Sequence, residues 1–154
     1  MANPRTIISP VGLSILDGRH GLKRHNVDLT PGQERQQLRE LVRSLGADAG
    51  RLSAELATLK AIEAGSEDTA VFLATDTDDS ERAARVNAII AEEHFLASTK
   101  TERVKSLVLD DAGRFRKEGV PSLVALLDRY VIGARNQGWE PWLSVSGGIK
   151  PVVP

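Results

Sequence analysis

A Gly-Gly-x-Lys motif near the end of the chain has residues suited to binding an anion. The motif Gly147-Gly148-Ile149-Lys150 comes directly after Ser146 and follows a short apolar run. Paired glycines let a backbone turn tightly and approach a ligand closely, while the lysine supplies a mobile positive charge that suits phosphate. We therefore expect an anion-binding loop here. For the glycine pair alone, a simple strand-to-loop turn is the alternative.

A second loop of similar construction lies near the start of the chain. The apolar run Thr6-Ile7-Ile8 breaks into Ser9-Pro10-Val11-Gly12-Leu13-Ser14. In α/β folds, ligands bind outside the carboxyl ends of parallel strands. If both loops follow neighbouring parallel strands, they lie at the same edge of the sheet, and that edge is where we expect the function.

A third group, Thr75-Asp76-Thr77, follows another apolar run. Hydroxyls, backbone amides and one lysine form a polar but weakly charged set, which suits a nucleotide-like ligand with phosphodiesters and sugar hydroxyls. Two structural alternatives stay open. Ser9 and Ser14 can instead satisfy backbone groups at a strand end, and Thr75 to Thr77 can simply cap the next helix. The predicted ligand contacts are Ser9, Pro10, Val11, Gly12, Leu13, Ser14, Thr75, Asp76, Thr77, Ser146, Gly147, Gly148, Ile149 and Lys150.

Other polar clusters are weaker candidates. The basic segment 19–25 is either a flap over phosphates or a solvated loop. Its His20 and His25 lack the further ligands that a metal site needs. Around Asp76, the aspartates Asp78 and Asp79 do not match a calcium loop, because neither the glycine nor the final glutamate is correctly spaced. We expect neither a metal nor a cofactor.

The elements that must position these loops alternate along the chain. Short apolar segments separated by longer helical patterns are typical of βαβ units around a parallel sheet. We predict an α/β, doubly wound, Rossmann-like fold, with a mainly parallel sheet and helices on both faces. In such sheets strand one often lies beside strand four, at the switch point where a crevice opens. The predicted strands are Arg5–Ser9, Thr69–Thr75, Arg103–Leu109 and Trp142–Ser146, and residues 94–101 are predicted to be a connection.

Helices are predicted from apolar residues at three- and four-residue spacing. Thr30 followed by Pro31 is a helix start signal, Asp78 with Glu81 resembles a capping box, and Gly138 is placed to end the last helix. Trp139 and Trp142 flank a proline, and we expect them to pack at the entry to the last strand. The helical stripes lie within residues 38–45, 52–62, 83–90 and 123–134.

Composition excludes several functional classes. The chain has 154 residues with 41% hydrophobic content, enough for one domain spanning 1–154 with a sizeable core. Twenty basic and twenty-one acidic residues give no general attraction to long nucleic acid. The sequence contains no cysteine, so thiol chemistry is excluded. Because neither a signal peptide nor an apolar stretch of roughly 18 residues is present, we expect no membrane span and a cytoplasmic location.

The loop from Ser9 to Leu16, the Thr75 to Thr77 group and the terminal segment from Ser146 to Pro151 together resemble the CRISPR-associated Rossmann-fold (CARF) domains. The similarity covers nearly the whole chain in element order, and the first and last motifs are its most specific parts. The resemblance implies a homodimeric sensor of type III CRISPR antiviral signalling. Such a sensor binds a cyclic oligoadenylate, commonly cyclic tetra-adenylate, across its two-fold axis and regulates an effector. In that family, the loop after the first strand and the Gly-Gly-x-Lys loop both contact the ring.

Some members of the family are ring nucleases that cleave the bound messenger without metal, using a ribose 2′-hydroxyl. For this alternative, Lys150 is expected to stabilise developing charge, and Ser9 or Ser14 to position the ligand. A dinucleotide-dependent oxidoreductase is a weaker hypothesis, because the first loop lacks the full G-x-G-x-x-G fingerprint.

The sequence departs from the family in two ways. Ser144 and Ser146 stand where many relatives have asparagine and threonine, which affects the side-chain contacts of the last loop more than its backbone contacts. Relatives also usually continue beyond the point corresponding to Pro154, into a further helix and often an effector domain. The expected explanations are a truncated chain, a stand-alone sensor, or one part of a split system.

Overall fold

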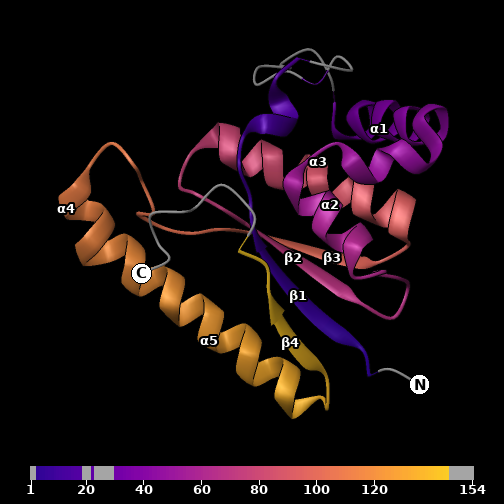
Figure 1. Ribbon diagram of the computed structural model, residues 1–154. Helices are drawn as coiled ribbons and strands as arrows, with labels where there is room; N and C mark the ends of the chain where they lie inside the picture. Colours follow the sequence, from indigo (N-terminus) through magenta and orange to yellow (C-terminus); the bar gives the residue numbers. More distant parts are fainter. Residues whose placement is uncertain (1–2, 19–21, 23–29, 146–154) are drawn as a thin grey trace.

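The computed structural model describes residues 3–18, 22 and 30–145. Strands and helices alternate along them, as predicted (Figure 1). The elements in chain order are β1 (Arg5–Pro10), η1 (Ser14–Leu16), α1 (Pro31–Leu45), η3 (Gly46–Arg51), α2 (Ala54–Ala61), β2 (Thr69–Ala74), α3 (Asp78–Phe95), β3 (Ser98–Arg103), α4 (Ala112–Arg114), η4 (Phe115–Gly119, a π-helical turn), α5 (Val120–Asn136) and β4 (Glu140–Leu143).

The described strands form one four-stranded parallel sheet in the order β3-β2-β1-β4. Helices α1, α2 and α3 cover one face of the sheet, and α5 covers the other (Figure 1). The chain therefore has the predicted doubly wound, Rossmann-like α/β fold. Strand one lies beside strand four, as predicted, and the strand order reverses between them.

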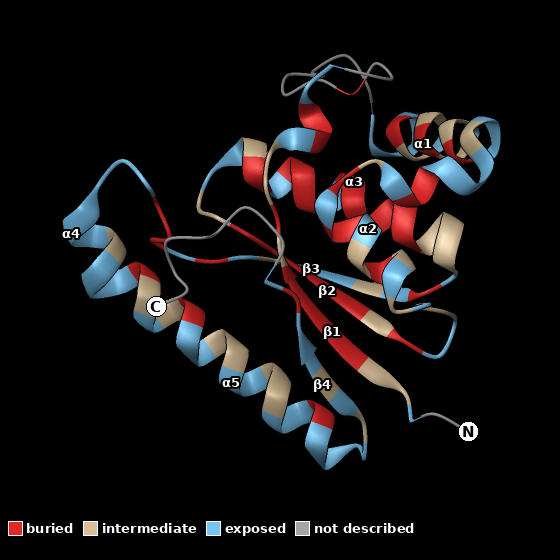
Figure 2. Ribbon diagram, viewed as in Figure 1, coloured by how far each residue is buried: buried red, intermediate tan, exposed pale blue. Residues whose placement is uncertain are grey.

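The two central strands are buried on both faces (Figure 2). In β2, Phe72 packs into the core under α1 to α3, while Val71 and Leu73 pack towards α5. In β1, Ile7 and Ile8 divide between the two faces in the same way. Continuous apolar runs are expected where a parallel strand has helices on both sides, and these two strands were correctly predicted.

The third strand was wrongly predicted. β3 is Ser98–Arg103, not Arg103–Leu109, and most of it lies in the stretch predicted to be a connection. It is a polar edge strand with largely exposed side chains, so its sequence has no apolar run. The apolar residues Val104 and Leu107 follow the strand instead, and they pack in a loop against the α5 side of the sheet.

Two other boundaries differ from the prediction. β4 begins at Glu140, two residues before the predicted start at Trp142, and it ends at Leu143. The N-cap of α3 is Thr77, whose hydroxyl accepts a hydrogen bond from the Ser80 N–H, so Asp78 is the first helical residue rather than the cap. A hydroxyl whose backbone is still extended can accept this bond, whereas a residue already in the helix cannot.

The other predicted helix signals are confirmed. Thr30 and Gln33 form a capping box at the start of α1, with Pro31 as the first helical residue. Gly138 adopts a positive φ of 74° just after α5, a conformation that favours glycine. Within the described residues, none of the helices combines the length and apolar character needed to cross a membrane.

Buried charges connect elements on the α1 to α3 side. Glu34 of α1 is buried and forms ion pairs with Arg82 and Arg85 of α3, at 3.2 and 2.9 Å. At the amino end of β1, Arg5 pairs with Asp68, with 2.9 Å between Nη2 and Oδ2. These contacts fix α1 against α3 and the start of β1 against the segment that enters β2.

Candidate functional site

The carboxyl ends of β1, β2 and β4 lie side by side, and we call this border of the sheet the carboxyl-end edge. Beyond the end of β1, the Val11 N–H donates to the carbonyl of Leu73 on β2, at 3.0 Å. On the other side, the Ser144 N–H donates to the carbonyl of Ile8, at 2.8 Å. The first predicted loop therefore leaves the sheet between the end of β2 and the last described residues after β4.

The loop from Ser9 to Ser14 is fixed by apolar side chains. Val11 is buried in the core under α1 to α3, and Leu13 packs against the same core. The turn η1, which follows, buries Ile15 and Leu16 there as well. Pro10 and Gly12 are partly exposed between these anchors. The loop is thus held in place while its backbone remains accessible to a ligand.

The two candidate serines differ in accessibility. Ser9 is only 1% exposed, and its Oγ has no hydrogen-bond partner within the described part of the chain. Ser14 is exposed at the start of η1. Of the two hydroxyls, that of Ser14 is at the surface, where a ligand can reach it. The Ser9 hydroxyl lies beneath the loop.

Sequence reasoning missed one residue that shapes this loop. Glu55, in the first turn of α2, is 2% exposed, and its Oε1 accepts a hydrogen bond from the Gly12 N–H at 2.7 Å. Ser53 fixes the start of α2, because its Oγ caps the helix through the Leu56 N–H and donates to Asn87 of α3. A glutamate in a first helical turn is ordinary, since the helix dipole stabilises it there, so nothing in the sequence singles it out.

The second predicted group, Thr75 to Thr77, mainly organises its own corner. The Thr75 N–H donates to Ser80 Oγ at 2.8 Å, and Thr77 caps α3. Asp76 accepts from the Ser106 N–H and from Arg103 Nε, both at 2.8 Å. These two hydrogen bonds, that of Ser106 first, hold the pKa of the Asp76 carboxyl below its usual value. The capping role left open for this group is therefore filled by Thr77.

Arg103 concentrates charge at this corner. It ends β3 and reaches the carboxylates of Glu81, Asp78 and Asp76 at 2.8 to 2.9 Å, and their hydrogen bonds raise its pKa. Arg114 lies 3.5 Å from Asp76 on the other side. The two arginines offset the acidic first turn of α3, which would otherwise repel an anion at the edge.

Several predicted site residues lie outside the described residues. Ser146, Gly147, Gly148, Ile149 and Lys150 all do, and so do His20 and His25 in the basic segment. Of that segment only Leu22 is described, and it is buried. Within the described ranges, no cluster of three or more histidine, aspartate or glutamate side chains is arranged to hold a metal ion.

A scan of the sequence against known protein families identifies the family of this chain. The model of a family described as CRISPR-associated protein (Cas_APE2256) matches residues 50–154. A comparison with curated proteins found no match. The family match covers more than half of the chain and extends from the end of η3 through α2 to α5, β4 and the Gly-Gly-x-Lys segment. The chain belongs to this family of CRISPR-associated proteins.

Proposed function

We propose that the chain is a CARF-type sensor that binds a cyclic oligoadenylate at the carboxyl-end edge. The main support is the adjacency of β1 and β4 at the switch point of a parallel sheet, where doubly wound folds bind nucleotides. Membership of a CRISPR-associated family is consistent with a messenger used in that defence. The sequence resemblance to CARF domains supplies the identity of the messenger.

The loop after β1 supports the proposal through its fixed position and its exposed hydroxyl. Its anchors hold Pro10 and Gly12 at the rim of the sheet, and Ser14 adds an exposed hydroxyl. In the sequence, Lys150 follows β4 by only a few residues. A hydroxyl and one ammonium group are donors that phosphodiester oxygens and ribose hydroxyls accept.

The ligand's symmetry motivates the proposed homodimer. A cyclic tetra-adenylate has approximate two-fold symmetry, and an isologous dimer presents the same donors twice around such an axis. Each protomer then contributes one lysine and one loop to half of the ring. Regulation of an effector domain or subunit follows if ring binding draws the two loops together.

Calorimetric titration of the chain with cyclic tetra-adenylate tests this function. We expect one ring per dimer, and we expect Lys150→Ala to weaken binding by about tenfold or more, as for loss of a charge-assisted hydrogen bond. Lys60→Ala is the matched control, because α2 ends near the opposite border of the sheet, where Arg5 donates to the carbonyl of Ile62. Light scattering with and without the ring measures the dimer.

The same mixtures distinguish a sensor from a ring nuclease. An intact ring recovered after incubation supports a sensor, whereas linear products formed in the presence of a chelator support the ring nuclease. If the wild-type chain binds neither cyclic tetra-adenylate nor cyclic hexa-adenylate, the proposal is wrong.

A further inference from the structure

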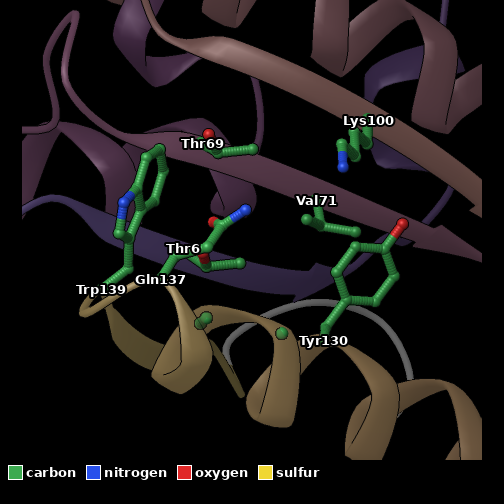
Figure 3. A pocket seen from close by; sticks show the side chains of 9 residues that line it. Thr6, Thr69, Val71, Lys100, Tyr130, Gln137 and Trp139 are labelled. Atoms are coloured by element: carbon green, nitrogen blue, oxygen red, sulfur yellow. The ribbon is translucent and has the colours of Figure 1, made fainter.

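A cavity lies at the opposite border of the sheet from the proposed messenger site. It has a volume of about 250 Å³ and opens between α5 and the sheet, close to the amino ends of β1 and β2 (Figure 3). Thr6 and Thr69, which are paired in register at the start of these strands, line its floor. The cavity shares no residue with the loops of the carboxyl-end edge.

The cavity exists because α5 lacks a side chain in its last turn. Tyr130 and Gly133 of α5 and its C-cap residue Gln137 are spaced along one face, and all three line the cavity. A Cβ placed on Gly133 would meet nothing within 4 Å, so the space above this residue is open. Glycine in a helix interior costs about 1 kcal/mol relative to alanine. The helix thus carries an unfavourable residue at the point where a side chain would enter the cavity.

The walls offer hydrogen-bonding groups that have no partner in the described structure. No described residue hydrogen-bonds to the hydroxyls of Thr6 and Thr69 or to the side-chain amide of Gln137. Thr6 is only 7% exposed, whereas Gln137 is exposed at the rim. In Figure 3 the Gln137 amide extends into the space between the strands and α5. Polar groups of this kind orient a small ligand within a pocket.

The charge in the cavity is positive. Lys100 lies with its Nζ 5.8 Å from the centre of the Tyr130 ring, and no described carboxylate forms an ion pair with it. The nearby Glu102 already accepts hydrogen bonds from Tyr130 and Arg129, at 2.7 and 3.2 Å. Burial and the Glu102 hydrogen bond raise the pKa of Tyr130 to about 12, so the phenol stays neutral at physiological pH.

The two ends of the cavity differ in chemistry. Trp139 stands at one end, and Lys100 lies with Tyr130 at the other (Figure 3). An indole provides a flat surface on which a planar ring can stack, while a free ammonium binds an anionic group. The hydroxyls of Thr6 and Thr69 and the side-chain amide of Gln137 lie between these ends, where they can hydrogen-bond to the sugar hydroxyls of a ligand.

We propose that this cavity is a second ligand site, for a nucleoside monophosphate. The base would stack on Trp139, the ribose would contact Thr6, Thr69 and Gln137, and the phosphate would pair with Lys100. A volume of about 250 Å³ is below the roughly 300–1,000 Å³ of drug-sized sites, so a ring of four nucleotides is excluded. The site is separate from the messenger site and does not depend on it.

Titration of the full chain with each of the four common ribonucleoside 5′-monophosphates tests the proposal. Adenosine and inorganic phosphate serve as component probes. We expect at least one monophosphate to bind, and we expect the matching nucleoside and phosphate alone to bind about tenfold or more weakly, because each makes only part of the contacts. Lys100→Ala should lower the affinity about tenfold or more, whereas Lys117→Ala, at an exposed position on η4, should leave it unchanged.

A variant that fills the cavity tests the need for open space separately from the need for the Lys100 charge. Gly133→Leu should abolish mononucleotide binding and keep or raise the melting temperature, because it fills open space and improves helix propensity. The same variant should still bind the cyclic ring, so failure of one proposal does not affect the other. Absence of binding by all four monophosphates overturns the site. Unchanged binding by folded Gly133→Leu, or by Lys100→Ala, does so as well.

Discussion

At the residue scale, one buried carboxylate controls the geometry of the proposed messenger loop. Glu55 reaches from α2 to the Gly12 N–H, in the middle of the loop that follows β1. This hydrogen bond matters because it sets the path of the loop backbone that leads to the exposed Ser14. The loop could be predicted from its residue types. The hydrogen bond from Gly12 to Glu55 could not, because Glu55 is distant in sequence and is an ordinary residue for the first turn of a helix.

We predict that Glu55→Ala lowers the free energy of unfolding by about 1.5–3 kcal/mol, the usual value of a hydrogen bond to a charged group. It should also weaken binding of the cyclic ring, because the loop around Gly12 loses the contact that holds its backbone in place. Glu55→Gln is the control, since its amide oxygen can still accept from Gly12. Urea unfolding and calorimetry measure the two effects. Equal affinities in the alanine variant and the wild type would exclude the positioning role.

At the element scale, the sequence predicted the two fully buried strands and missed a polar edge strand. β1 and β2 are covered on both faces, so their apolar runs identify them. β3 lies at an edge of the sheet and has polar, largely exposed residues. The strand was predicted at the buried apolar residues Val104 and Leu107 instead, which follow β3. The pattern of apolar residues indicates which residues are buried and does not indicate which strands pair. A polar edge strand therefore cannot be recognised from this pattern.

The junction between the loop after β3 and the start of α5 permits a second test. A Cβ on Gly119 would lie 2.4 Å from the carbonyl oxygen of Ser106 and 2.9 Å from the Cα of Leu107. Both contacts are with backbone and cannot relax cheaply. Gly119→Ala should therefore destabilise the fold by about 1–3 kcal/mol, as overpacked sites do.

Gly133→Ala is the matched control for this substitution, because it meets open space within α5, the helix that follows Gly119. It should stabilise the protein by about 0.8–1 kcal/mol through helix propensity alone. Thermal unfolding of the two variants and the wild type measures the expected loss of stability in Gly119→Ala and the expected gain in Gly133→Ala. A Gly119→Ala variant as stable as the wild type would show that α5 can shift away from Ser106.

At the scale of the whole molecule, the predicted architecture and the adjacency of β1 and β4 are confirmed. These follow from general rules about how parallel strands are connected and ordered. The charge network at the carboxyl-end edge was not predicted. Arg103 contacts acidic residues more than twenty positions earlier, and such pairings depend on the sheet being assembled.

Acid should unfold the protein partly through Asp68. Burial of this carboxyl favours its neutral form, but hydrogen bonds from Arg5 and Gly65 outweigh burial and lower its pKa. Its stabilisation is therefore complete above its unfolded pKa of about 4 and is lost as the pH falls through the lower folded value.

Comparing Asp68→Asn with the wild type by urea unfolding from pH 7 to pH 3 tests this dependence. The variant should be less stable at pH 7, and the difference should shrink in acid. Asp110→Asn, at an exposed position, controls for the loss of one charge. A difference between variant and wild type that stays constant with pH would contradict the assignment to Asp68.

The register of the sheet has a consequence for synthesis of the chain. Ile8 pairs with Leu143, so β1 acquires one of its two neighbours only after all the segments between them have been synthesised. Until α5 and β4 have emerged, Ile8 and the rest of that side of the nascent sheet lack their cover. Parallel pairings over such separations form slowly and leave apolar surface open in the meantime, so the nascent chain can bind chaperones or aggregate during this interval.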